Sequence, residues 1–250
     1  MSRKKALRIA RTILASACLA ATAAPGHAEN APPAPQLVQG GQMLLVGYEA
    51  DPVALRAALP RELEPLGNMV LMNMYTVPDA MRTSGLGAYT LTYLTILVKG
   101  HDGYAVGSKD GLPGRYMLFY WNSSDSMRQF TRGAGFPDNP GGITSLVDGG
   151  GKATAALSVD GKPFIQASAD VADQWGGPSG GQSNYLIGSG KSLARVPVPW
   201  VCSAAETSNA SVTFSMPASH PAARFKPTKV VWAARMNCDI AYPQPVAFAK

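Results

Sequence analysis

The chain has 250 residues, with 22 Lys and Arg against 16 Asp and Glu, and a formal net charge of +6. Five of the basic residues and none of the acidic ones precede residue 29, so the remainder carries 17 basic and 16 acidic side chains, a net charge of +1. This balance, without basic stretches interleaved with aromatic residues, argues against a nucleic-acid partner. Only His101 and His220 follow residue 28, and no Cys/His cluster has ligand spacing, so neither a metal nor a cofactor is expected.

The first 28 residues have the layout of a secretory signal peptide. Basic residues in the first 11 positions precede an apolar run over 13–24, and small residues follow at Gly26 and Ala28. The run is shorter than the ~20 residues that a membrane-spanning helix needs, and its order of basic, apolar and small residues is that of a cleaved leader. A buried N-terminal helix is the alternative. We expect cleavage near Ala28, a periplasmic or secreted location, and no membrane association after cleavage.

The rest of the chain is long enough for one domain with a sizeable core. Residues 29–40 are rich in Ala and Pro and are expected to form a flexible linker, and residues 41–250 a single β-rich domain. Cys202 and Cys238 remain after the leader. Their even number and the oxidising compartment expected for an exported protein favour a disulfide between them, with two unpaired buried thiols as the alternative.

The first elements expected in the domain are a strand over 42–50 and a short helix over 51–60. Asp51 is the expected N-cap of this helix, Pro52 lies in its first turn, and Pro60 ends it. Its apolar side chains are expected to face the core: Val53, Leu55 and Leu59.

A second helix is expected in the middle of the chain. It begins at Ser123 or Ser124 as N-cap and ends at Gly133, with Met127 and Phe130 facing the core. The segments between the two helices are rich in Thr, Tyr and β-branched residues, which indicates strands. These strands are expected over 69–77, 88–98 and 115–121.

Strands also dominate the last hundred residues. They are expected over 152–159, 163–171, 183–189, 210–216 and 229–242, separated by Gly, Pro, Asn and Asp. Many short strands with few helices predict an antiparallel β architecture, either closed or packed as a sandwich. Closed barrels often hold a small ligand.

Three segments, in order, resemble the acetoacetate decarboxylase family. They are GYEADPVALRAALPRELEP (47–65), TSGLGAYTLTYLTILVKG (83–100) and GRYMLFYWNSSDSMRQFTRGAGFP (114–137), and SNYLI (183–187) and PTKVVWAARMNCDIAYPQPVAF (227–248) follow in the expected places. The resemblance implies a mainly β (α+β) fold: a closed antiparallel β-cone or barrel around an apolar pocket, with a few short peripheral helices. It extends from about residue 40 to the end.

In that family a lysine directly after an aromatic-proline corner forms a Schiff base with a β-keto acid, and a second lysine beside it lowers its pKa. In this chain the corner is Phe136-Pro137, and the next residues are Asp138 and Asn139. Neither side chain can form an imine. The family's frame is therefore kept while its nucleophile is missing, and decarboxylation through a lysine Schiff base is not expected.

Other family positions are also altered. The acidic residue of the second strand falls near Asn73, a later acidic residue falls on Leu91, and the pocket arginine falls near Gly41, whereas the arginine at the end of the helix is matched, one residue out of step, by Arg132. We take Asp138 and Arg132 as candidate catalytic residues. The matched positions give these candidate pocket residues: Asn73, Tyr75, Tyr89, Leu91, Phe136 and Asn139.

Each candidate has a structural alternative. Arg132 is expected either to hold a ligand carboxylate, with Asp138 as a general base, or to pair with Asp138 across the loop, with Asn139 as a turn residue. Asn73 and Tyr75 are more simply interpreted as satisfied polar residues on a strand than as catalytic residues. A substitute lysine is a further alternative, although all four candidates read more simply as solvated residues near strand ends: Lys99, Lys152, Lys162 and Lys229.

Two function classes follow. The first is an exported, lyase-like enzyme of the decarboxylase superfamily that acts on a small oxo acid or related carbonyl compound by other chemistry. The second is a non-catalytic periplasmic binding or structural protein that kept the barrel. In either case the expected partner is a small molecule, and a homo-oligomer remains open.

Overall fold

The computed structural model describes residues 34–247, so the predicted leader and its cleavage point lie outside the described residues. The described part is mainly β, as expected. Its elements in chain order are β1 (Gln36–Glu49), α1 (Pro52–Ala58), β2 (Pro65–Val77), η1 (Ala80–Arg82), β3 (Tyr89–Ala105), β4 (Leu112–Asn122), α2 (Asp125–Gly133), β5 (Gly142–Gly149), β6 (Lys152–Val159), β7 (Lys162–Trp175), β8 (Ser179–Ile187), η2 (Gly190–Ser192), β9 (Ala194–Phe214), η3 (Pro221–Phe225), β10 (Lys229–Tyr242) and β11 (Val246–Ala247).

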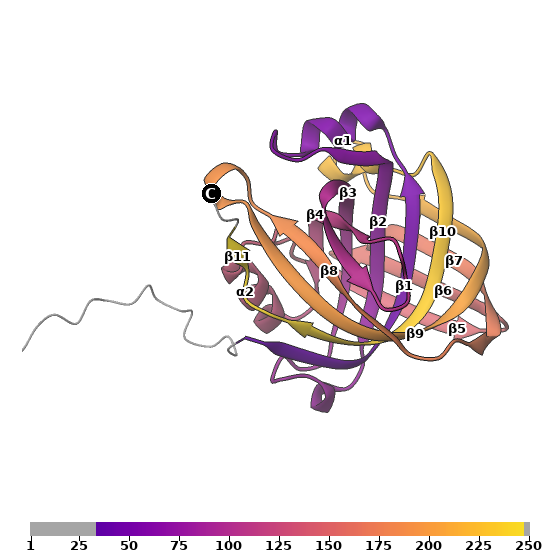
Figure 1. Cartoon of the computed structure of the whole chain (residues 1–250). Helices are drawn as coiled ribbons and strands as arrows, with labels where there is room; N and C mark the ends of the chain where they lie inside the picture. Colours follow the sequence, from indigo (N-terminus) through magenta and orange to yellow (C-terminus); the bar gives the residue numbers. More distant parts are fainter. Residues whose placement is uncertain (1–33, 248–250) are drawn as a thin grey trace, which may run out of the picture.

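Seven strands of the described part close into a ring. Hydrogen-bonded neighbours run β10–β1–β2–β3–β4–β8–β9, and a pairing between β9 and β10 completes the circuit. These pairings are antiparallel except for a short parallel contact between β4 and β8. Figure 1 shows the ring strands curving around a common interior, with β1 between β2 and β10. The expected cone-like antiparallel barrel is confirmed, and the short β4–β8 contact makes its closure uneven.

The strands β5–β7 form a second layer outside the ring. The first half of β9 pairs with β8 and β10, whereas its last residues, from Thr207 to Phe214, pair with β7. From β7 the sheet continues through β6 to β5, and β5 packs against β2 and β3. The long strand β9 therefore belongs to both layers and joins them.

Alternation of side chains along the ring strands divides the core into two parts. On β3, Tyr89, Leu91 and Tyr93 belong to the cluster inside the ring, whereas Leu94 and Ile96 belong to the cluster between the ring and the outer layer. Leu91 is 0% exposed, and burial of a side chain of this size contributes about 1.5–3 kcal/mol. The interior of the ring is therefore mostly filled by packed side chains.

Both helices begin where the sequence predicts. The Asp51 carboxylate accepts a hydrogen bond from the Val53 N–H at the start of α1, and the Ser124 hydroxyl accepts one from the Met127 N–H at the start of α2. The expected inward face of α1 is wrong at one position, because Val53 is 75% exposed. Only the Leu55 side of this short helix packs on the core.

The domain begins earlier than predicted. Residues 36–40, assigned to the flexible linker, form the start of β1, where Gln36 pairs with Tyr242 on β10. Gln36 and Val38 are buried there. The early start of β1 follows from closure of the ring, because these residues pair with the backbone of the last residues of β10. No helix within residues 34–247 has the length and apolar character that a membrane span requires.

Strand β5 was not predicted and β9 was predicted only in part, for physical reasons. In β5 the usual alternation is inverted: Ile143 is exposed, and Thr144 is buried with its hydroxyl bonded to Thr92. In β9 only 210–216 was expected, because Pro197 and Pro199 interrupt its first half. Both prolines lie where β9 is paired with β8 alone, between its contacts with β11 and β10, and a strand with one open side tolerates a missing N–H.

Candidate functional site

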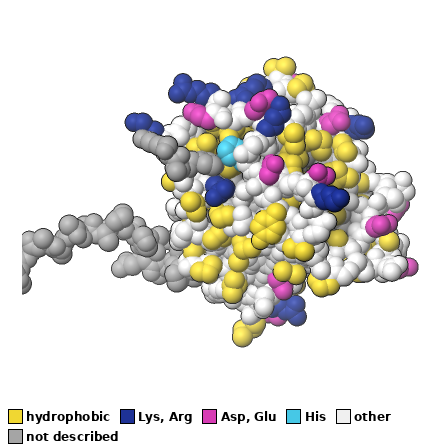
Figure 2. All heavy atoms as spheres, in the orientation of Figure 1, with side chains coloured by type: hydrophobic (Ala, Val, Ile, Leu, Met, Phe, Trp, Pro, Cys, Tyr) yellow, Lys and Arg dark blue, Asp and Glu magenta, His cyan; other side chains and the backbone are white. Residues whose placement is uncertain are grey.

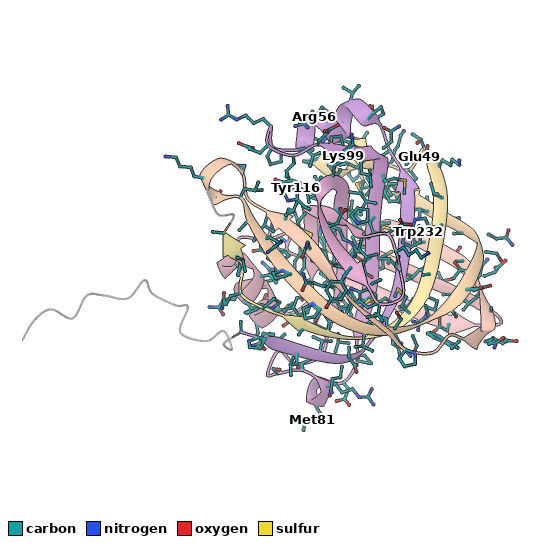
Figure 3. All side chains as sticks on the ribbon, viewed as in Figure 1. Glu49, Arg56, Met81, Lys99, Tyr116 and Trp232 are labelled. Atoms are coloured by element: carbon teal, nitrogen blue, oxygen red, sulfur yellow. A yellow bond between two sulfur atoms is a disulfide. The ribbon has the colours of Figure 1, made fainter. Side chains whose placement is uncertain are left out.

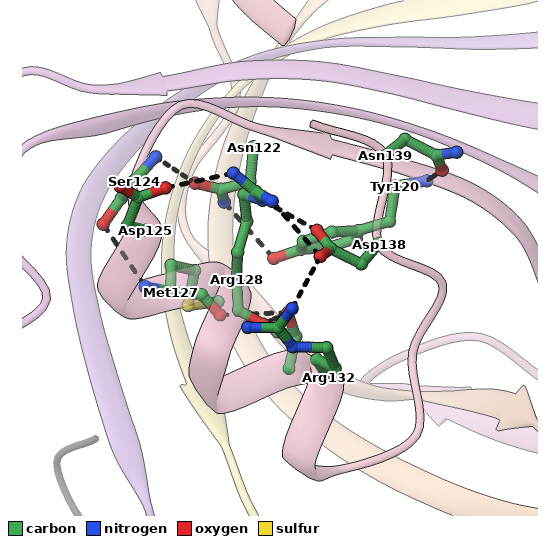
Figure 4. A network of polar contacts seen from close by, with 10 residues as sticks. Tyr120, Asn122, Ser124, Asp125, Met127, Arg128, Arg132, Asp138 and Asn139 are labelled. Atoms are coloured by element: carbon green, nitrogen blue, oxygen red, sulfur yellow. Dashed lines mark hydrogen bonds and ion pairs between the residues drawn. The ribbon is translucent and has the colours of Figure 1, made fainter. Parts of the chain in front are cut away.

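The aromatic-proline corner after α2 is held by a cluster of ion pairs (Figure 4). One carboxylate oxygen of Asp138 accepts from the Arg128 Nε at 2.7 Å, and the other accepts from Arg128 Nη2 at 3.2 Å and from Arg132 Nη1 at 3.3 Å. Arg128 also donates to Asp125 at 3.0 Å. The arrangement is that of the predicted ion-pair alternative, with Arg128 as a partner that the sequence analysis did not name.

The electrostatics of this corner do not suit proton abstraction by Asp138. The hydrogen bond from Arg128 lowers the pKa of the Asp138 carboxyl below its usual value, and the charges of Arg128 and Arg132 act in the same direction. Both carboxylate oxygens are already engaged by guanidinium groups. A carboxylate held in its charged form by such partners is a weak base.

The next residue and the aromatic residue of the corner attach the loop to β4. The Asn139 side-chain oxygen accepts from the Tyr120 N–H at 2.8 Å, and the Asn139 N–H donates to the Tyr120 carbonyl at 3.0 Å. Phe136 packs edge-on against the Tyr120 ring, with centroids 5.7 Å apart. Asn139 therefore directs its amide at backbone, where the resemblance would place a lysine amine.

The ring encloses a cavity of about 490 Å³, its open mouth included. All seven ring strands contribute to its wall. The lining residues are Met43, Leu45, Asn73, Tyr93, Arg115, Ser183, Tyr185, Val198, Trp200, Cys202, Met236, Cys238, Ile240 and Tyr242. The wall is largely apolar, and it carries a compact set of polar groups. None of the residues of the aromatic-proline corner is among them.

Four of the polar side chains form one row across β2, β3, β8 and β4. The Asn73 side-chain NH2 donates to the Tyr93 hydroxyl at 2.9 Å, the Tyr93 and Tyr185 hydroxyls share a hydrogen bond of 2.6 Å, and Arg115 Nη1 donates to the Tyr185 hydroxyl at 3.3 Å. Burial raises the pKa of Tyr93 well above its usual range, and the neighbouring Tyr185 adds to the rise. The Tyr93 phenol is therefore neutral at physiological pH and is available as a proton donor in a hydrogen bond.

Arg115 is the charged member of this row. Its guanidinium lies 5.7 Å from the centre of the Tyr185 ring, and its Nε–H is buried without an acceptor. Within residues 34–247 no carboxylate lies within ion-pair distance of it. A guanidinium that lines a cavity without a counter-charge is a ready binding group for an anion, because it can form two parallel hydrogen bonds with a carboxylate.

A second group of phenols adjoins the cavity. Tyr242, which lines the wall, shares a hydrogen bond of 2.6 Å with the Tyr75 hydroxyl, and Tyr75 shares one of 3.1 Å with Tyr89. Burial is the main cause that raises the pKa of each of these three tyrosines. Tyr75 and Tyr89, both expected in the pocket, thus lie one and two hydrogen bonds behind its wall.

The Cys202–Cys238 disulfide is also part of the cavity wall. The two residues are register partners on β9 and β10, the pair of strands that closes the ring. A disulfide across this seam stabilises the fold by about 2–4 kcal/mol and fixes one side of the cavity.

The lysines of the described part all lie at the surface. Lys99, Lys152, Lys162 and Lys229, the candidate substitutes for the missing nucleophile, are exposed, and so are the other lysines between residues 34 and 247: Lys109, Lys191 and Lys226. Lys99, labelled in Figure 3, is paired with Glu64. On the face shown in Figure 2, Lys and Arg side chains lie on the outside, mostly toward the end that carries α1. No described lysine lines the cavity.

The structure thus separates the expected site residues into two groups. Asn73 lines the cavity, and Tyr75, Tyr89 and Leu91 lie in the buried cluster around it. The others belong to the corner: Arg132, Phe136, Asp138 and Asn139. For the part of the chain described, no group of three or more His, Cys, Asp or Glu side chains is arranged to hold a metal ion.

Two polar residues of the cavity wall, Arg115 and Tyr185, were not predicted from the sequence. A signal for Arg115 was present, because it lies two residues before Met117, which is buried in the cluster inside the ring. Two-residue spacing on a strand places both side chains on one face, so an arginine in step with inward residues marks an internal charge. Tyr185 lay inside the quoted SNYLI segment, but the cross-strand contact that joins it to Tyr93 could not be read from sequence.

Comparison with known proteins gives a consistent result. The family model described as acetoacetate decarboxylase matches residues 20–184, and no curated protein sequence matches. Similar solved structures include one titled as structural studies of acetoacetate decarboxylase (17% identity, TM-score 0.64, covering 87% of this chain and 90% of that chain). Another is acetoacetate decarboxylase from Legionella pneumophila (17%, TM-score 0.68, 92% and 93%). A third is the enduracididine biosynthesis enzyme MppR complexed with pyruvate (16%, TM-score 0.60, 87% and 91%).

Proposed function

The chain belongs to the acetoacetate decarboxylase family, and within it we propose that this member holds a small oxo acid or a related carbonyl compound in the ring cavity without forming a Schiff base. The observation that carries the proposal is Arg115, a guanidinium that lines the cavity and has no carboxylate partner within residues 34–247. It is the anchor for the ligand carboxylate. The hydroxyls of Tyr93 and Tyr185 beside it receive the oxo group.

Ligands of the fold relatives support this class of compound. MppR is described in complex with pyruvate, a 2-oxo acid, and the other relatives are named for acetoacetate, a 3-oxo acid. Both molecules carry a carboxylate and a carbonyl oxygen, the two groups that Arg115 and the tyrosine hydroxyls of the cavity wall can bind. An apolar wall with a few convergent polar groups is the usual form of a small-molecule site.

Of the two roles expected from the sequence, binding without catalysis has the stronger support. The described lining contains no Asp, Glu, His or Lys that would act as base or nucleophile. The base role predicted for Asp138 remains a prediction, and its two guanidinium partners favour the ion-pair alternative. Catalysis has one observation in its favour, the neutral Tyr93 phenol, since such donors stabilise an enolate oxygen as it forms.

Calorimetric titration of the purified chain with pyruvate and with acetoacetate tests the proposal. We expect saturable binding of at least one of them. Borohydride added to the same mixtures should leave the protein mass unchanged, because every described lysine lies outside the cavity. A reduced adduct on a lysine, or no binding of any small carboxylate, would overturn the proposal. Release of CO2 from acetoacetate above the solution rate, without an adduct, would favour the catalytic role.

Export is part of the proposal and rests on separate observations. The basic, apolar and small layout of the first 28 residues supports it, and so does the Cys202–Cys238 disulfide, since such bonds persist in oxidising compartments. N-terminal sequencing of protein recovered from the cell envelope or medium checks it. A mature chain that begins near Glu29 is expected, and one that begins at Met1 would refute cleavage.

A further inference from the structure

Asn73 lines the cavity, and its amide carries an acceptor that nothing in the described chain satisfies. Asn73 is 4% exposed and lines the cavity, and its side-chain oxygen is buried without a hydrogen-bond partner. Its NH2 group faces two acceptors, the Tyr93 hydroxyl oxygen at 2.9 Å and the Met43 sulfur at 3.5 Å. These contacts orient the amide, so its oxygen is the atom left for a ligand.

The neighbouring tyrosines supply a donor at the same place. Asn73 and Arg115 can only donate through the atoms that contact Tyr93 and Tyr185, so the two phenol oxygens act as acceptors in those contacts. The single hydrogen bond between Tyr93 and Tyr185 consumes one of the two hydroxyl protons. The other proton has no assigned acceptor and is free to be donated to a ligand oxygen.

The polar row therefore offers three features together: a charged donor at Arg115, a neutral donor from the tyrosine pair, and an acceptor at Asn73. A carboxylate fits the first. A hydroxyl group fits the other two at once, because its oxygen accepts while its proton is donated. A ketone oxygen fits only the donor and leaves the Asn73 oxygen buried and unpaired.

We infer that the cavity prefers a small carboxylate that carries a hydroxyl group, as in a 2- or 3-hydroxy acid or an enol, over the corresponding oxo acid. The inference rests on the proposed carboxylate site and refines its ligand class, placing hydroxy acids above the oxo acids that the same site also accepts. A ligand hydroxyl that pairs with this otherwise unpaired buried acceptor gains a hydrogen bond, which is enough to give about a tenfold preference. Sites built to pair with a hydroxyl discriminate in the same way against analogues that lack it.

Calorimetry on matched pairs tests the inference: lactate against pyruvate, and 3-hydroxybutyrate against acetoacetate. For the wild-type chain we expect the hydroxy acid of at least one pair to bind about tenfold more tightly. In Asn73→Leu the preference should fall to about twofold or less, since the acceptor is gone. Asn122→Leu is the matched control. Asn122 is also buried and also donates to a tyrosine hydroxyl, but it does not line the cavity, so its preference should equal that of wild type.

The outcomes separate this inference from the proposed function. If oxo acids bind as tightly as hydroxy acids, or more tightly, the hydroxyl preference is wrong while the carboxylate site stands. If the preference persists in Asn73→Leu, the assignment to Asn73 is wrong. If no carboxylate of either kind binds, the proposed function itself fails. The wild-type comparison decides the first point even where Asn73→Leu does not fold.

Discussion

The aromatic-proline corner and the ring cavity differ in whether their polar and charged side chains have partners. In the corner the Asp138 carboxylate forms ion pairs with two guanidinium groups, and the Asn139 side-chain oxygen accepts a hydrogen bond from the backbone of β4. In the cavity Arg115 has no carboxylate within the described chain, and the oxygen of Asn73 has no donor. The first region is complete without a ligand, whereas the second is not.

Under the proposed function, the family's reactive position has become a structural contact, whereas ligand binding is kept in the ring cavity. Fold does not carry function; the groups of the site do. Buried polar and charged groups are expensive unless paired, so a protein that keeps unpaired ones inside its ring has a use for them. In the corner the same types of residue serve to dock α2 and its loop on β4.

The largest effect is expected from a charge placed in the packed part of the ring interior. Leu91→Glu buries a carboxylate where Leu91 is fully enclosed, and an uncompensated charge there should cost about 3–5 kcal/mol of unfolding free energy. Chemical denaturation measures it. Val53→Glu on α1 is the control and should change stability by less than about 0.5 kcal/mol, since Val53 faces solvent. Equal stability of the two variants would mean that β3 does not present Leu91 to the interior.

Opening the seam of the ring should have the next largest effect. Cys238→Ala removes the link between β9 and β10 and should lower the unfolding free energy by about 2–4 kcal/mol. A reductant should then destabilise the wild type but leave the variant unchanged. Titration of the denatured, non-reduced chain of residues 29–250 should find no free thiol, and two free thiols there would show that the pair is not joined.

Breaking the corner should cost less and should depend on pH. Asp138 is 18% exposed on its side chain, and Asp138→Asn should destabilise by about 1–2 kcal/mol at pH 7. Because Arg128 lowers the folded-state pKa of Asp138, the contribution of the carboxylate is present above its unfolded pKa of about 3.9. It is lost as the pH falls through the lower, folded value.

Asp125→Asn provides the control for this prediction, since the Asp125 side chain is 97% exposed and also contacts Arg128. Its effect at pH 7 should be below about 0.5 kcal/mol. Denaturation of both variants and the wild type from pH 3 to pH 8 gives the comparison. A penalty for Asp138→Asn that is unchanged at pH 3 would argue against the ion pair as its source.

The helix caps and most ring strands were predictable because their causes are local. Asp51 and Ser124 cap their helices through contacts two and three residues away. The strand β3 is recognisable from the types and order of its own residues. The linker boundary, β5 and the first half of β9 were not predictable, because β10, the Thr92–Thr144 contact and the open side of β9 at Pro197 are set by distant segments.

The site residues divide in the same way, into those visible in the local sequence and those that depend on distant segments. The sequence shows that Asp138 and Asn139, not lysines, follow the aromatic-proline corner, and it shows Asn73 as a polar residue in an apolar strand. The row that joins Asn73 to Arg115 requires the register of four strands and the parallel β4–β8 contact, where Arg115 pairs with Tyr185. No periodicity within one segment encodes that contact.

The most direct test compares two arginines, one from each region. In the proposed arrangement Arg115 anchors the ligand carboxylate, and Arg132 serves only the corner. Calorimetry with the tightest-binding small carboxylate should show a loss of affinity on the order of 100-fold in Arg115→Met, with no loss of stability. It should show wild-type affinity in Arg132→Met. Retained affinity in Arg115→Met together with lost affinity in Arg132→Met would contradict this arrangement and would indicate that the ligand binds at the aromatic-proline corner.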